Sequence, residues 1–119
     1  MIIGSISENK DLEKRISITP EIAKKYINLG FEIHLSENYG SHLGFEKKKY
    51  SEVGVNFFND DKKIIENSDI IIQMSLLSED KIIYLKSNQT LIGVLNPYEN
   101  KKNLEALVKK KINLFSLDL

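Results

Sequence analysis

Short apolar runs alternate with helical patterns along the whole chain of 119 residues. The runs are MIIGSI, FEIHLS, VNFF, DIIIQM, TLIGVL and INLFSLDL, and each has the length of a strand. A strand, a helix and a second strand in succession are typical of parallel pairing, because the helix returns the chain to its starting edge. The alternation predicts a single α/β domain over residues 1–119, a flavodoxin- or Rossmann-like unit with a mainly parallel open sheet and helices on both faces.

Capping residues mark the ends of the expected helices. Thr19 and Pro20 are typical of an N-cap and a first helical residue, and Gly30 is typical of the position after a helix. Asn59 and Ser78 are candidate N-caps of two later helices. The last helix has three apolar residues on one face, which we expect to be buried: Leu104, Leu107 and Val108.

Composition excludes several classes of function. The formal net charge is zero, so the chain lacks the basic surface of a nucleic-acid-binding protein. It has no cysteine, which excludes disulfides, thiolate catalysis and cysteine-based metal sites. No basic region precedes the first apolar run, and no run approaches the roughly 18 residues of a membrane span. We therefore expect a soluble cytoplasmic domain.

Arg15 is the only arginine among 17 basic residues. Its guanidinium can bind a carboxylate or a phosphate through two parallel hydrogen bonds, whereas lysine offers a point charge. Arg15 lies between the first strand and the first helix, at the edge where open parallel sheets bind ligands. It is a candidate ligand-facing residue, and the alternative is a surface ion pair with Asp11 or Glu13.

The two histidines give weaker signals. His34 lies at a polar position of the alternating run FEIHLS, which predicts a solvated side chain. His42 lies in a loop between Gly40 and Gly44, and loops do carry sites. Neither histidine has neighbours spaced for a catalytic triad or a metal site.

Acidic and amide residues near strand ends are further candidates. Asp60 and Asp61 are expected at a helix N-terminus, where carboxylates are favoured, and Asp69 in a turn. Asn96 follows an apolar strand in VLNPYEN, at the edge where ligands bind. The alternative is an Asn-Pro turn in which Asn100 caps the next helix.

The six glycines form neither G-x-G-x-x-G nor a phosphate loop ending in G-K-[ST]. The sequence therefore gives no indication of its own dinucleotide or nucleoside-triphosphate site. It also stops directly after the last apolar run, where a ligand site would continue, so we expect a fragment or a lone domain of a larger enzyme.

These segments together resemble the N-terminal domain of the alanine dehydrogenase/pyridine nucleotide transhydrogenase family. EKRISITP is similar to the family's E-x-R-V-A-x-T-P motif, and the resemblance continues through ENYGSHLGF, YSEVGV and SDIIIQM over essentially the whole chain. It implies that the dinucleotide-binding half of the family's protein is missing from this chain.

Three positions relate the chain to the two branches of that family. The resemblance implies that Ser75 replaces a substrate-binding lysine of alanine dehydrogenases, and that Asn96 replaces their catalytic histidine. Arg15 matches the arginine that holds the substrate carboxylate in that branch. We therefore expect Arg15, Ser75 and Asn96 to face a cleft, and we assign none of them a catalytic role.

The segment NPYENKKNLEAL resembles instead the W-P-A-Q-N-P-E-L stretch of transhydrogenase alpha subunits. This implies the N-terminal part of the NAD(H)-binding subunit of a proton-translocating NAD(P) transhydrogenase, which passes hydride between NAD(H) and NADP(H). Both cofactors then belong to the complete enzyme, and we expect neither to bind this chain alone. The implied partners are the remaining NAD-binding domain and the membrane and NADP-binding subunits, at the cytoplasmic face of the inner membrane.

Two other functions stay open at this point. One is an amino-acid dehydrogenase-like oxidoreductase fragment with an altered substrate. The other is a non-catalytic assembly module, which the short chain and the missing glycine motif permit. In either case we expect a homodimer, because a truncated sheet should bury its open face.

Overall fold

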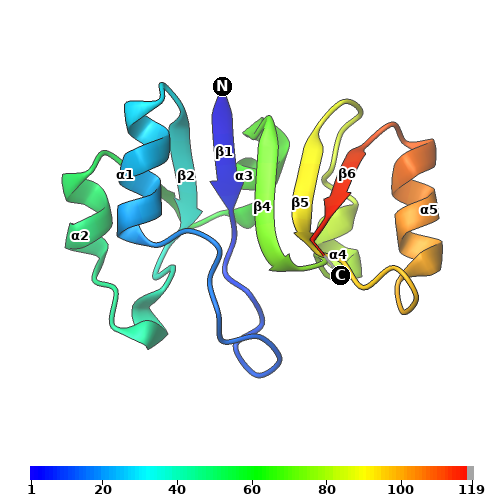
Figure 1. Ribbon diagram of the computed structural model, residues 1–119, viewed down its shortest axis with the longest axis horizontal. Helices are drawn as coiled ribbons and strands as arrows, with labels where there is room; N and C mark the ends of the chain where they lie inside the picture. Colours follow the sequence, from blue (N-terminus) through cyan, green and yellow to red (C-terminus); the bar gives the residue numbers. More distant parts are fainter. Residues whose placement is uncertain (118–119) are drawn as a thin grey trace.

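The computed structural model describes residues 1–117, which form one sheet with helices on both faces (Figure 1). The strands are β1 (Ile2–Ser5), β2 (Glu32–Ser36), β3 (Asn56–Phe58), β4 (Ile70–Ser75), β5 (Thr90–Val94) and β6 (Asn113–Ser116). Their order is β3-β2-β1-β4-β5-β6, and all the pairings are parallel. The predicted α/β class is thus confirmed, and this strand order is that of a doubly wound sheet. The end of the last predicted strand, residues 118–119, lies outside the described residues.

The helices divide between the two faces of the sheet. They are α1 (Pro20–Asn28), α2 (Lys47–Glu52), α3 (Asp61–Asn67), α4 (Glu79–Ile82) and α5 (Lys101–Lys109), with a short 3-10 turn η1 (Ser41–Leu43). In Figure 1, α1 and α2 lie in front of the β1–β3 half, whereas α3 and α4 lie behind the sheet. Right-handed crossovers require this division, because the chain moves away from β1 first in one direction and then in the other.

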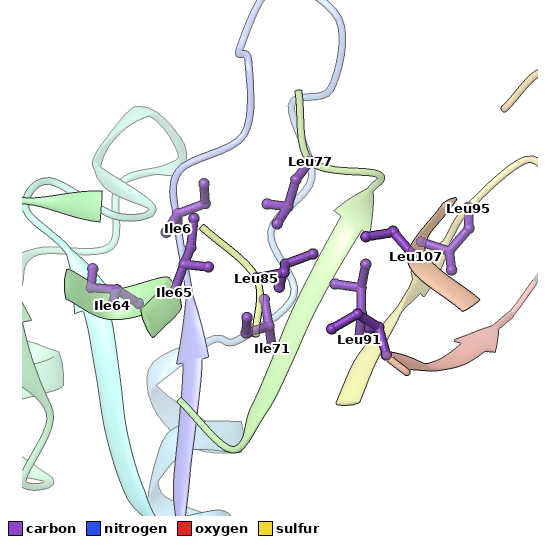
Figure 2. Close-up of a cluster of buried hydrophobic side chains, with 10 residues drawn as sticks. Ile6, Ile64, Ile65, Ile71, Leu77, Leu85, Leu91, Leu95 and Leu107 are labelled. Atoms are coloured by element: carbon purple, nitrogen blue, oxygen red, sulfur yellow. The ribbon is translucent and has the colours of Figure 1, made fainter. Parts of the chain in front are cut away.

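A separate apolar cluster fills each face. Behind the sheet, Ile64 and Ile65 of α3 pack with Ile71, Leu91 and Leu107, as Figure 2 shows. Since Leu107 belongs to α5, this helix covers the same face as α3. The cluster under α1 and α2 is built from these buried residues: Ile3, Ile18, Ala23, Ile33, Leu35, Tyr39, Tyr50 and Val55.

The first helix begins and ends as its capping residues predict. The Thr19 side chain accepts a hydrogen bond from the Ile22 amide, Pro20 is the first helical residue, and Gly30 follows the helix with φ +100°. The prediction for the third helix is wrong by one residue. Asp60, not Asn59, is its N-cap, because its carboxylate accepts from the Lys62 amide.

Two burial predictions are also wrong. His34 is only 8% exposed, because β2 lies between β1 and β3 and contacts α1 on one face and α3 on the other. Its ring packs 4.7 Å from the Phe58 ring, between centroids. Val108 is 61% exposed, whereas Leu107 is buried, so the buried stripe of α5 is narrower than its apolar stripe.

Candidate functional site

The sheet has a topological switch point between β1 and β4. The chain leaves β1 towards β2 on one side, and it later returns to β4 on the other side. Loops that follow neighbouring strands then diverge to opposite faces and leave a crevice at their carboxyl ends. A cavity of about 420 Å³ opens at this point, between the loop after β1 and the end of β4. Its charged lining residues are Glu8, Glu13 and Lys81.

Glu8 is the central acid of this cavity, and the sequence patterns did not single it out. Its carboxylate accepts hydrogen bonds from the backbone amides of Met74 and Ser75, at 3.1 Å each, and from the Gln73 side chain at 2.5 Å. Burial raises the pKa of the Glu8 carboxyl above its ordinary value, and the amide hydrogen bonds oppose that shift. The only sequence signal was a carboxylate shortly after an apolar strand.

Gln73 continues the pairing of β1 with β4 beyond the backbone ladder. That ladder joins Ile3 to Ile70 and Gly4 to Ile71. The Gln73 side chain then accepts from the Ile6 amide at 2.7 Å and donates to the Ile6 carbonyl at 3.1 Å. A buried side-chain amide thus satisfies the backbone at the floor of the cavity, where the two strands separate.

Tyr39 anchors the far end of the loop after β1. Its hydroxyl accepts from the Ser17 and Ile18 amides, both at 3.1 Å, which leaves its own proton for Ser5 Oγ at 3.0 Å. Tyr50 donates to the Ile18 carbonyl at 2.8 Å. Burial raises the pKa of both tyrosines, so their hydroxyls keep their protons and hold the loop in place.

Lys81 is the only basic residue in the cavity lining, and it is paired. Its ammonium lies 2.6 Å from Asp61 Oδ2, and Asp61 Oδ1 accepts from Ser36 Oγ at 2.7 Å. Asp61 is in the first turn of α3, next to the N-cap Asp60, which confirms the prediction that both carboxylates serve a helix start.

Arg15 forms the ion pair that was the alternative prediction. Its Nε and Nη2 donate to the two oxygens of Glu13, at 3.0 and 2.8 Å, and its backbone amide donates to the same carboxylate. The Arg15 side chain is 68% exposed and that of Glu13 is 14% exposed. The Arg15 hydrogen bonds lower the pKa of Glu13 to about 2.

The structure brings some of the predicted site residues together. Ser75 lines the cavity, and Arg15 touches it through Glu13. Asn96 follows β5, one strand further along, and is not part of the cavity lining. Its backbone has φ +47°, and its carbonyl accepts from the Glu99 and Asn100 amides, so the predicted Asn-Pro turn is confirmed.

The remaining candidates have structural contacts. Asn100 is at the N-cap position of α5, but its side chain donates to the Leu95 carbonyl rather than accepting from the helix. A ring nitrogen of His42 lies 2.7 Å from the Lys14 carbonyl and fastens the loop that carries Arg15. Asp69 accepts from the Ile2 amide at 2.7 Å, which ties the turn before β4 to β1.

The loop after β1 does not have the form of a dinucleotide site. A pyrophosphate cradle needs a glycine-rich turn that leads directly from the first strand into a helix N-terminus. Here residues 6–19 separate β1 from α1, and they contain no glycine. The described residues 1–117 include no cluster of three His, Asp or Glu side chains placed to hold a metal, and none of their helices could span a membrane.

Comparisons with known proteins agree on one family. A model of the family described as alanine dehydrogenase/PNT, N-terminal domain, matches residues 4–119. An NAD(P) transhydrogenase alpha subunit of Rickettsia prowazekii is 30% identical over 122 residues, which cover 99% of this chain and 32% of that protein. Alanine dehydrogenase 1 of Staphylococcus aureus is 24% identical over 116 residues, with 98% of this chain and 31% of that protein covered.

Two solved structures have the same fold. A transhydrogenase from Sinorhizobium meliloti matches 98% of this chain and 34% of its own, with a TM-score of 0.89 and 21% identity. An L-alanine dehydrogenase matches 98% of this chain and 32% of its own, with a TM-score of 0.89 and 17% identity. The chain therefore spans about a third of the length of these relatives.

Proposed function

The chain belongs to the alanine dehydrogenase/PNT N-terminal domain family, and we propose that it is the N-terminal part of the NAD(H)-binding alpha subunit of an NAD(P) transhydrogenase. In the complete enzyme, hydride would pass between NAD(H) and NADP(H), coupled to proton translocation. The cavity between β1 and β4 would form one wall of the cleft over NAD(H), with Arg15, Ser75 and Asn96 along its edge.

The observation that carries this proposal is the charge state of the cavity. A site for an oxo acid needs an available cation to bind the substrate carboxylate. The one lysine of the lining is paired with Asp61, and Arg15 at the rim is held by both oxygens of Glu13. Ser75 stands where the resemblance places a substrate lysine. A wall that shapes and dries a cleft fits this arrangement better than a site that grips a carboxylate.

The contribution of this chain would be positioning rather than chemistry. Hydride transfer needs close alignment of the two nicotinamides and exclusion of water. Glu8 and Gln73 fasten the loop after β1 to the end of β4, and Tyr39 fastens its other end. A rigid wall of this kind can hold an aligned geometry without contributing a catalytic group.

The proposal has consequences for assembly. NAD(H) and NADP(H) would be bound by other parts of the enzyme, since the loop after β1 lacks a pyrophosphate cradle. The partners would be the remaining NAD-binding domain and the membrane and NADP-binding subunits, with the alpha subunit as a homodimer. The domain would work in the cytoplasm, at the face of the inner membrane.

The test is a chimera. This chain would replace the aligned region of the Rickettsia prowazekii relative, and hydride transfer from NADH to an NADP analogue would be measured with that relative's partner subunits. We expect transfer at a rate within about tenfold of the unmodified relative, because the replaced region contributes shape and no reacting group. A folded, assembled chimera that transfers no hydride but aminates pyruvate would refute the proposal.

A second candidate, an amino-acid dehydrogenase-like function, is favoured by one observation. Arg15 matches a carboxylate-binding arginine, and an incoming carboxylate could displace Glu13 from its guanidinium. Titration of pyruvate against the wild-type chimera and Arg15→Ala separates the two candidates. Saturable binding that Arg15→Ala abolishes would support the dehydrogenase, whereas the absence of binding would favour a transhydrogenase wall or a non-catalytic assembly module.

A further inference from the structure

One half of the sheet lacks helices on one of its faces. In Figure 1, α1 and α2 stand in front of the β1–β3 half, and no described helix stands in front of β4, β5 and β6. The helices α3, α4 and α5 lie behind the sheet, where Ile71, Leu91 and Leu114 pack against them. We call the uncovered side the β4–β6 face.

The β4–β6 face has an apolar row that runs straight across the three strands. Ile72 pairs in register with Ile92, and Ile92 pairs with Phe115. These residues alternate with Ile71, Leu91 and Leu114, so they point away from the covered side. Ile72 reaches the cluster under α1, but Ile92 joins neither cluster, and Phe115 is 59% exposed.

A parallel sheet with one face open is unusual. Parallel sheets occur almost only with both faces covered, because the crossover helices and their neighbours bury two apolar surfaces. The row of Ile72, Ile92 and Phe115 has the composition of a covered strand surface. An apolar face of this kind is the signature of an interface with another polypeptide.

The shape of the face selects the kind of polypeptide. Three adjacent strands span roughly 10 Å between the outer two, at about 4.8 Å per spacing. A single α-helix with its side chains is about 10–12 Å wide, so one helix fills the strip between α1 and the β6 edge. A second copy of the sheet is a poorer fit, because α1 and α2 project on the same side and would hold a flat partner away.

The comparisons indicate where such a helix would come from. The chain spans 32% of the Rickettsia prowazekii relative and 34% of the Sinorhizobium meliloti structure. We propose that the β4–β6 face is the docking surface for one amphipathic helix from the other two-thirds of that enzyme, with apolar residues at i, i+3, i+4 and i+7 on Ile72, Ile92 and Phe115. This inference rests on the proposed function, because that function supplies the partner polypeptide.

The experiment measures binding and not activity. The probe is the region of the Rickettsia prowazekii relative outside the aligned residues, produced as a separate polypeptide and titrated into the full chain by calorimetry. We expect saturable binding that Phe115→Asp weakens at least tenfold. Val108→Asp is the matched control, because Val108 is as exposed as Phe115 but lies on α5, and it should leave the affinity unchanged. Far-UV circular dichroism establishes that both variants are folded.

Three results would overturn the inference: no binding by the wild-type chain, equal affinity of Phe115→Asp and wild type, or a dimer of this chain that Phe115→Asp dissociates while the probe does not bind. The last result would assign the face to a second copy. Binding that Phe115→Asp weakens, in a chimera that transfers no hydride, would keep this inference and refute the proposed function.

Discussion

At the scale of single residues, the Arg15–Glu13 pair has a measurable consequence. The guanidinium lowers the pKa of Glu13 from its ordinary 4.5 to about 2, chiefly through side-chain hydrogen bonds. A carboxyl with a depressed pKa in the folded state adds stability above about pH 4.5, and that stability is lost as the pH falls towards 2. Arg15→Ala should return the pKa of Glu13 towards its ordinary value, as observed by NMR titration of the side-chain carboxyl.

Arg15→Lys is the control for this prediction. It keeps the positive charge but removes the fork that binds both oxygens, so it should restore only part of the shift. The wild-type protein should lose more stability than Arg15→Ala between pH 5 and pH 2, in the window set by Glu13. An unchanged Glu13 pKa in Arg15→Ala would show that this pair does not form in solution.

Tyr39 is a residue whose hydroxyl matters more than its ring. Tyr39→Phe keeps the buried ring and leaves the amides of Ser17 and Ile18 without their acceptor. Leaving buried donors unsatisfied costs about 1–3 kcal/mol, so we expect the free energy of unfolding in urea to fall by that amount. Tyr98→Phe removes a hydroxyl from a fully exposed side chain and should have no effect. A Tyr39→Phe protein as stable as wild type would mean that water replaces the hydroxyl.

At the scale of secondary-structure elements, periodicity predicted the order of strands and helices, because each element buries a face with a fixed repeat. It could not predict the burial of His34. Alternation marks polar positions as solvated only when one face of a strand is open, and α3 closes the second face of β2. The cap at Asp60 rather than Asn59 is a choice between two good capping residues, which backbone geometry decides.

The candidate site was predictable only in its location. The edge at the carboxyl ends of the strands follows from parallel topology. The role of Glu8 depends on the amides of Met74 and Ser75, and these are brought to it by the pairing of β1 with β4 across a wide gap in sequence. Arg15 was singled out by its rarity, but residue type cannot reveal that Glu13 already occupies its fork.

The contact between β1 and α3 gives a prediction about an element. Gly4 lies where β1 passes α3, and a Cβ there would overlap Ser68 Oγ and approach Ile64 Cγ2 to 3.0 Å. Overpacking of this kind typically costs about 1–3 kcal/mol, so Gly4→Ala should lower the urea midpoint accordingly. Ser68→Ala removes the hydroxyl, and the double variant should be less destabilised than the sum of the two single variants. Strict additivity would mean that α3 moves away from β1 instead.

At the scale of the whole molecule, the two edges of the sheet differ. The β3 edge is closed by aromatic packing, with Phe57 against Tyr50 at 5.8 Å and Phe58 against His34 at 4.7 Å between ring centroids. The β6 edge has Phe115 exposed beside the uncovered β4–β6 face. Both are edge strands in the same sheet, so the difference between them is one of side-chain packing and not of topology.

This asymmetry predicts how the molecule opens. Amides with few buried contacts exchange through local opening, whereas central amides exchange only with global unfolding. We expect the β1 amides to exchange slowest, with a strong dependence on denaturant, and the β6 amides to exchange faster than those of β3 with little dependence on denaturant. Native-state hydrogen exchange measured by NMR or mass spectrometry over a low urea range tests this order. Exchange of β6 as slow as that of β1 would mean that the β4–β6 face is already covered in the isolated chain, and sedimentation at the same concentration would then show a second copy on it.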